Sequence, residues 1–256
     1  MNYQVDLNSD LGESFGAYTI GQDEQVLEFV SSANVACGYH AGDYNVMDKT
    51  VKLAKEKGAG IGAHPGFPDL AGFGRRKMEM TPGEVHRLVT YQIGAIEAFC
   101  RVHQVSLQHV KPHGALFNIA SVDTKTAEAI AEAVYDVNPS LILFGLAGGE
   151  LITAGKRLGL RCANEVFADR TYLPDGTLTP RSNPEALIHS TEEAVERVIK
   201  MITKKQTEAL DGTVIDLDAD TICVHGDKPE ALEFVKHVRK VFSENNITVQ
   251  PIGEWK

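Results

Sequence analysis

The chain has 256 residues, of which 43% are hydrophobic and 23% are charged, and its formal net charge is −10 at pH 7. This length and composition suit one globular domain, so we expect residues 1–256 to form a single domain with an ample core. The negative charge argues against nucleic acid or an anionic membrane as the main partner, because both repel an acidic surface. A small anionic substrate stays open, since local Lys and Arg residues can outweigh the global charge.

The N-terminus and the cysteines bear on where the protein works. Residues 1–10 are strand-like and acidic rather than a signal peptide, and no apolar stretch approaches the roughly 18 residues that span a bilayer. The cysteines lie far apart without a C-x-x-C spacing, and we expect reduced thiols; they are Cys37, Cys100, Cys162 and Cys223. These features predict a cytoplasmic protein.

The first predicted strand, residues 3–8, alternates apolar and polar side chains. Asp6, Asn8 and Asp10 share one face, and the apolar residues share the other. In a barrel, we expect the apolar face to contact helices and the polar face to point toward the interior and the mouth.

Six further apolar runs follow in chain order, with helix-like stretches between them. The predicted strands are residues 33–37, 60–64, 107–112, 141–144, 161–167 and 221–225. The predicted helices are residues 23–31, 45–57, 81–100, 124–137, 190–204 and 229–243, with a short helix after Gly149. The tail, residues 247–252, fits either an eighth strand or a closing edge. Strands that alternate with helices and end in polar residues are typical of a β/α barrel with its active site at the C-terminal strand ends.

Two long turn-rich segments, residues 65–80 and 168–182, interrupt this alternation. A loop as long as the first is usually functional in a compact domain. It contains Arg75 and Arg76, the only adjacent arginine pair in the chain, which we hold as a reserve candidate for binding an anion.

Four of the nine histidines end predicted strands, namely His40, His64, His113 and His225. In a barrel they should converge on one cleft together with Asp10. Such a set could hold a divalent metal such as zinc, or its members could serve as general acids and bases. The spacing decides neither, and no predicted helix carries an H-x-x-x-H or H-E-x-x-H motif.

Two cationic groups could bind a substrate anion near these histidines. Lys111 shares strand parity with His113 and suits a carboxylate or a phosphate, although an internal ion pair with Asp6 or Asp10 is the alternative. Asp169 and Arg170 form a similar case, because a guanidinium suits bidentate carboxylate binding but the two residues could be structural. Further polar residues just beyond strand ends are second-rank candidates: Glu13, Asp43 and Asp227.

Common nucleotide-binding and nucleophile motifs are missing from the sequence. Residues 145–150, GLAGGE, are not a P-loop, because no Lys-Ser/Thr follows. No G-x-G-x-x-G opens a helix, and there is no G-x-S-x-G nucleophile elbow.

Six stretches of the chain resemble the lactam-utilisation LamB/YcsF family. They are DLNSDLGESFG (6–16), SANVACGYHAGD (32–43), IGAHPGFPDLAGFGRR (61–76), VKPHGALFN (110–118), EVFADRTY (165–172) and CVHGD (223–227). The resemblance runs from residue 6 to at least residue 227. Ser9 stands where many members carry Cys, so we do not expect an essential thiol nucleophile at that position.

The resemblance implies a distorted seven-stranded β/α (TIM-like) barrel of the glycoside hydrolase/deacetylase type. It also implies ATP-driven ring opening of 5-oxo-L-proline to L-glutamate, within a 5-oxoprolinase that needs two further subunits, B and C. The missing P-loop fits ATP activation by those partners, and a divalent metal stays open.

Two sets of residues are therefore assigned roles. Water and protons would be handled by Asp10, His40, His64 and His113. The substrate would be bound by Asn8, Lys111, Asp169, Arg170 and His225. Two alternatives are a stand-alone metal-dependent amidohydrolase or deacetylase, and a non-catalytic lactam-binding subunit.

Overall fold

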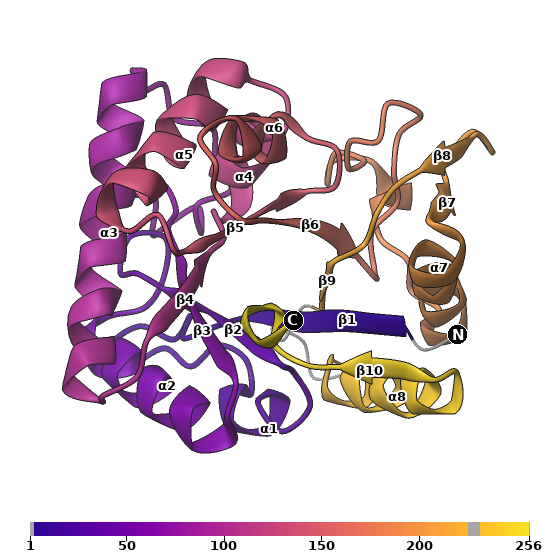
Figure 1. Cartoon of the computed structure of the whole chain (residues 1–256), viewed down its shortest axis with the longest axis horizontal. Helices are drawn as coiled ribbons and strands as arrows, with labels where there is room; N and C mark the ends of the chain where they lie inside the picture. The colour runs from indigo at the N-terminus through magenta and orange to yellow at the C-terminus, as the bar shows by residue number, and fades with distance from the viewer. Residues whose placement is uncertain (1–2, 225–230, 256) are drawn as a thin grey trace.

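The computed structural model describes residues 3–224 and 231–255, and within them seven parallel strands close into a barrel. The order around the barrel is β1-β2-β3-β4-β5-β6-β9, and β9 closes it by pairing with both β6 and β1. The strands are β1 (Tyr3–Leu11), β2 (Ser32–Ala36), β3 (Gly60–His64), β4 (Leu107–Val110), β5 (Ile142–Leu146), β6 (Cys162–Phe167) and β9 (Thr221–Cys223). The β/α barrel expected from the sequence is confirmed (Figure 1).

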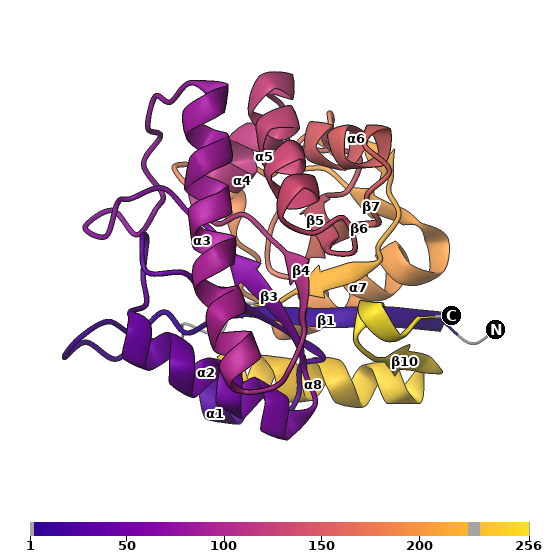
Figure 2. The same ribbon diagram turned by 60° about the vertical axis from the view of Figure 1, so that its left-hand side comes forward.

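Helices surround the barrel on its outside, and α3 and α5 pack against each other there (Figure 2). The α-helices are α1 (Asp23–Val26), α2 (Tyr44–Lys57), α3 (Pro82–Val102), α4 (Gly114–Ala120), α5 (Thr124–Val137), α6 (Glu150–Arg157), α7 (Thr191–Lys204) and α8 (Ala231–Glu244). Two short 3₁₀ helices are η1 (Pro184–Ala186) and η2 (Ile252–Glu254). Among the described residues, no helix combines the length and apolar content that a bilayer crossing requires.

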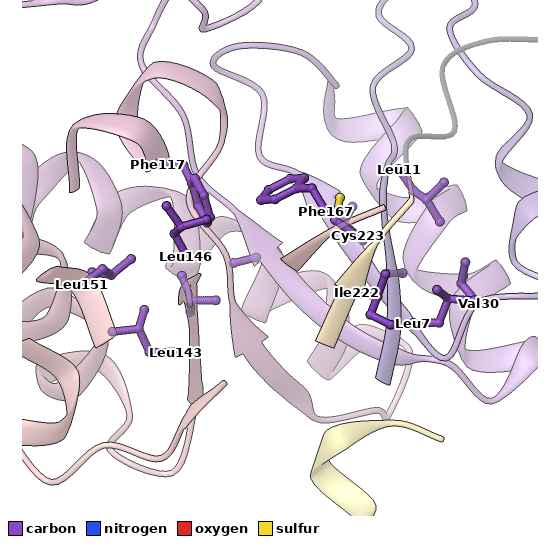
Figure 3. Close-up of a cluster of buried hydrophobic side chains, with 14 of the residues drawn as sticks. Leu7, Leu11, Val30, Phe117, Leu143, Leu146, Leu151, Phe167, Ile222 and Cys223 are labelled. Carbon is purple, nitrogen blue, oxygen red and sulfur yellow. The ribbon is translucent and has the colours of Figure 1, made fainter. Parts of the chain in front are cut away.

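The main apolar core lies between the strands and these helices. Figure 3 shows part of it, with side chains from β1, β5, β6 and β9 beside residues of α4 and α6. Val5 and Leu7 of β1 belong to this layer, whereas the alternate residues Asp6 and Asn8 are buried among polar side chains inside the barrel. The alternation read from the sequence therefore holds, and it aims one face of β1 at the site.

Sequence signals for helix ends are accurate in two places. Thr81 and Glu84 form a capping box at the start of α3, where each side chain bonds the other residue's backbone N–H. Gly58 ends α2 in the left-handed conformation, at φ 70°.

Two elements end earlier than predicted. The helix predicted over residues 23–31 ends at Val26, because the chain must turn so that Ser31 can donate its N–H to the Leu7 carbonyl. The strand predicted over residues 107–112 ends at Val110, before Pro112, which has no N–H to donate to a neighbouring strand.

The structure adds elements that the sequence patterns do not define. Helix α4 begins directly after His113, and the strands β7 (Gln206–Glu208) and β8 (Val214–Asp216) form a separate antiparallel pair. The tail forms β10 (Ile247–Val249), which pairs with the first residues of β1 outside the seven-stranded ring. All four cysteines are free thiols, as expected.

Candidate active site

A buried ion network lies inside the barrel toward the C-terminal strand ends. Lys111, 2% exposed, places its Nζ 2.8 Å from Asp10 Oδ1 and 2.8 Å from Glu165 Oε1. Asn8 donates to Glu165 and accepts from Lys111 at 3.1 Å, and Asn34 donates to Asp10 at 2.8 Å. The ion pair between Lys111 and Asp10, the alternative to a substrate-binding Lys111, is present, and Glu165 is a second carboxylate on the same ammonium.

Burial acts on both members of the Lys111–Glu165 pair. Burial alone would lower the pKa of Lys111, but the carboxylates of Asp10 and Glu165 and the nearby Cys223 hold it well above its ordinary value. Burial raises the pKa of Glu165, and the Lys111 charge opposes that rise. Lys111 is therefore a permanent cation at neutral pH, and its charge is matched within the protein.

Three of the four strand-end histidines converge beside this network, together with Glu13. His113 Nδ1 lies 2.9 Å from His64 Nε2, and His64 Nε2 lies 3.3 Å from Asp10 Oδ2. The His40 ring stacks on the His113 ring at a centroid distance of 3.7 Å, and His40 Nε2 lies 3.5 Å from Glu13 Oε1. These residues come from β1, β2, β3 and β4 or the turns that follow them, as the barrel geometry requires.

The turn-rich segment 65–80 covers the histidines. Gly74 has a φ of 62°, and a Cβ there would stand 2.7 Å from His40 and 2.8 Å from His113, so only glycine lets the backbone pass this closely. The preceding residue, Phe73, accepts a hydrogen bond from His113 Nε2 and sets its ring edge-on against both imidazoles. Arg76, in contrast, points to Asp69 within the loop.

The surroundings of His40 and His113 lower the pKa of both imidazoles. Burial, then the neighbouring His113 and His64, lowers the pKa of His40 well below its ordinary value. Burial and His64 likewise lower the pKa of His113 to about 3. Both rings are therefore neutral at physiological pH.

A cleft of about 570 Å³ opens onto this site. Its lining includes Phe73 and Arg75 of segment 65–80, and Arg170, Thr179 and Arg181 of segment 168–182. Asp10, Glu13, His64, Lys111 and His113 lie along its lining as well.

Arg170 supplies a buried positive charge to the cleft. It is 4% exposed, and its guanidinium donates to the carbonyls of Ala186 and Thr179. Among the described residues, no carboxylate oxygen forms an ion pair with it, although Asp169 lies near enough to favour its charge. Burial and the neighbouring Arg181 lower the pKa of Arg170 to about 10, so it stays charged at neutral pH.

The residues predicted from sequence divide into three groups. The structure brings Asp10, His64, Lys111, His113 and Arg170 together along one cleft. Asn8 and His40 are fully buried behind it, and Asp169 is half-buried beside Arg170 without being part of the lining. His225 lies outside the described residues, as does the second-rank candidate Asp227. Of the other two second-rank candidates, Glu13 lines the cleft and Asp43 caps α2.

Some buried polar residues of the site had no predicted role. Glu165 and Asn34 belong to the ion network, and His109 hydrogen-bonds Asn34 at 2.8 Å. Their common signal is a polar residue in the middle of an apolar strand, at the parity that faces the barrel interior. That signal could have been found by extending the β1 alternation to β2, β4 and β6.

The histidine cluster is able to hold a metal ion. Glu13, His40, His64 and His113 each offer a ligand atom, and these atoms lie within 4.8 Å of one another. Imidazole nitrogen and carboxylate oxygen are ordinary ligands of zinc and similar ions. The expected metal-capable set is thus present in part, with Glu13 as a member.

Comparisons with known proteins agree with the fold. A sequence model of the LamB/YcsF family matches residues 5–256. A protein of Halalkalibacterium halodurans, named as the A subunit of 5-oxoprolinase, is 61% identical over 98% of this chain and 98% of its own length. The Bacillus subtilis protein of the same name is 58% identical over 99% of both chains.

Solved structures give the same picture. The crystal structure of a lactam utilization protein from Thermus thermophilus is 45% identical, covers 96% of this chain and 99% of its own, and has a TM-score of 0.91. The catalytic domain of a peptidoglycan N-acetylglucosamine deacetylase from Eubacterium rectale, at 12% identity and a TM-score of 0.53, covers 98% of this chain and 89% of its own. This second likeness is one of fold alone.

Proposed function

The chain belongs to the LamB/YcsF family, and we propose that it acts as the A subunit of a 5-oxoprolinase. The proposed reaction opens 5-oxo-L-proline to L-glutamate, with ATP hydrolysed in a complex with subunits B and C. The observation that carries the proposal is the similarity, at 58–61% identity and nearly full length, to proteins of that name.

The charges of the cleft suit a small carboxylic acid. The substrate is an anion at neutral pH, and a chain with net charge −10 would repel it unless a local cation offset the field. Lys111 is already matched by Asp10 and Glu165, whereas Arg170 has no carboxylate ion pair among the described residues. We therefore favour Arg170 over Lys111 as the group that holds the substrate carboxylate, with Arg75 in reserve.

Asp10 is placed to handle the proton of the attacking water. Its side chain is 15% exposed, Lys111 and Asn34 hold Oδ1, and Oδ2 faces His64 Nε2 at 3.3 Å. In ring opening, water oxygen bonds to the lactam carbonyl carbon, the ring C–N bond breaks, and the nitrogen takes up a proton. Asp10 would accept the water proton and then donate it to the leaving ring nitrogen.

ATP use is assigned to the partner subunits. A lactam is a stabilised amide, and activation of its carbonyl oxygen would make attack by water feasible. The sequence has no P-loop or dinucleotide fingerprint, which supports a division in which partners B and C activate the substrate. Cytoplasmic location and a single domain remain predictions.

One observation favours a second candidate, a stand-alone metal-dependent amide hydrolase or deacetylase. The group Glu13, His40, His64 and His113 could hold an ion that replaces ATP-driven activation. That enzyme would need neither ATP nor partner subunits.

A glutamate-release assay on 5-oxo-L-proline separates the candidates. We expect no appreciable glutamate from the purified chain, with or without ATP, and ATP-dependent glutamate formation once subunits B and C are added. Robust ATP-independent release by the chain alone would favour the second candidate and contradict the first.

A further inference from the structure

The hydrogen bonds of two histidines fix which ring nitrogens carry protons. His64 Nδ1 lies 2.7 Å from the Lys111 carbonyl oxygen, and His113 Nε2 lies 2.8 Å from the Phe73 carbonyl oxygen. A carbonyl oxygen only accepts, so each of these nitrogens must carry the hydrogen that it donates. In the neutral rings, His64 Nε2 and His113 Nδ1 then each carry a lone pair and no hydrogen.

These two lone pairs face each other at 2.9 Å. Two acceptors at this distance repel unless a positive charge lies between or beside them. Carboxylate oxygens increase the need for a cation, because Asp10 Oδ2 lies 3.3 Å from His64 Nε2 and Glu13 Oε1 lies 3.8 Å from His113 Nδ1.

A third imidazole completes the donor set. His40 is fully buried, and neither of its ring nitrogens has a hydrogen-bond partner among the described residues. Its Nε2 lies 3.5 Å from Glu13 Oε1. A buried imidazole of this kind is costly to leave unsatisfied, and a bound cation would use its lone pair.

We propose that Glu13, His40, His64 and His113 bind one divalent transition-metal ion of the zinc class, with Asp10 beside it. Zinc bonds of about 2.0–2.2 Å put tetrahedral ligands about 3.3–3.6 Å apart. Three spacings among these atoms, 2.9, 3.5 and 3.8 Å, bracket that distance, and all four atoms lie within 4.8 Å of one another. Three imidazoles favour zinc, iron, cobalt or nickel over magnesium or calcium, which prefer oxygen ligands.

The hydrogen bonds around the cluster orient its imidazole rings as in known metal sites. Metal-binding histidines usually donate their second ring nitrogen to a carbonyl or carboxylate, which orients the ring. The Lys111 and Phe73 carbonyls do this for His64 and His113. When bound, such an ion would polarise a carbonyl oxygen as a Lewis acid. Only this catalytic role rests on the proposed function; metal binding itself does not.

Metal binding can be measured without substrate, so its failure and failure of the proposed reaction are distinguishable. The full chain is stripped with a chelator, desalted, and titrated with Zn²⁺ by calorimetry and with Co²⁺ by visible absorption. We expect one equivalent of either ion and weak or no binding of Mg²⁺. A chain that binds neither Zn²⁺ nor Co²⁺ would overturn the inference.

Variants show whether the ion occupies this cluster. Glu13→Gln and His113→Gln should each weaken Zn²⁺ binding by more than the ~10–100-fold typical of changes around a metal site. His86→Gln is the matched control, because His86 lies on the outside of the barrel and pairs with Asp136. Unchanged binding in both cluster variants would mean an adventitious surface ion and would overturn the assignment.

If a variant fails to fold, the protonation of the histidine ring nitrogens can be measured by NMR in the wild-type chain instead. Long-range ¹H–¹⁵N correlation spectra of the wild-type chain should show hydrogens on His64 Nδ1 and His113 Nε2, and Zn²⁺ should shift the opposite nitrogens. Spectra that show a doubly protonated His64 and no response to Zn²⁺ would mean that a shared proton joins the two rings, and the metal site would be refuted.

Discussion

Replacing Lys111 by Met is expected to destabilise the chain strongly. Met fills a similar volume but removes the ammonium that lies 2.8 Å from both Asp10 and Glu165, leaving two carboxylates without their cation. Removing one partner of a buried ion pair typically costs about 3–5 kcal/mol. Since Glu165 is fully buried, we expect the free energy of unfolding to fall by an amount in this range at pH 7.

The same charges predict how that loss depends on pH. Burial already raises the pKa of Glu165, and removing the opposing Lys111 charge raises it further. A carboxyl whose folded pKa is raised binds its proton more readily in the native state, so stability falls as pH rises above the ordinary value of 4.5. The deficit of Lys111→Met should therefore shrink as the pH is lowered from 7 toward 5.

Urea unfolding followed by circular dichroism measures both effects. The double variant Lys111→Met/Glu165→Gln serves as the control, because it also removes the Glu165 carboxylate charge that Lys111→Met leaves without a cation. We expect it to recover at least about 1 kcal/mol relative to additivity, since directly interacting residues couple by about 0.5–3 kcal/mol. A single variant within about 0.5 kcal/mol of wild type at pH 7 would refute the role given to Lys111.

Two further changes test the substrate clamp and the helix start. Arg170→Met should raise the half-saturation constant for 5-oxo-L-proline about 10- to 150-fold in the complete complex, because a charge-assisted hydrogen bond is worth about 1.5–3 kcal/mol. The surface variant Arg157→Met is the control. An unchanged constant in Arg170→Met would mean that Arg75, not Arg170, binds the substrate carboxylate. Thr81→Ala should lower the free energy of unfolding by about 1 kcal/mol in urea titrations, because it removes the cap that accepts the Glu84 N–H; no change would mean that the capping box contributes nothing.

The barrel could be predicted from sequence because its signals are local. Each strand is a short apolar run, and polar residues such as His64 and His113 follow directly at its end. The boundary of α1 failed because a contact with another strand sets it, since Ser31 bonds to β1. The boundary of β4 failed because Pro112, which has no N–H, was included in the predicted strand.

The site was harder to predict because barrel closure joins distant strands. Glu165 reaches Asn8 across 157 residues of sequence, and nothing near Glu165 in the chain indicates its partner. The convergence of His40, His64 and His113 followed from strand order, whereas their tautomers depend on backbone carbonyls whose positions only the folded loops define.

The replacement Asp10→Asn in the complete complex shows whether this cleft carries out ring opening. Asn keeps the shape of Asp10 but cannot accept the water proton, and losing a general base typically costs about 10²–10⁴ in rate. Asp175→Asn is the control, because Asp175 lines the same cleft at its exposed edge. We expect this loss of ATP-dependent glutamate formation with assembly of the complex intact. Wild-type turnover by Asp10→Asn would contradict it and would leave the chain a lactam-binding component without a catalytic role.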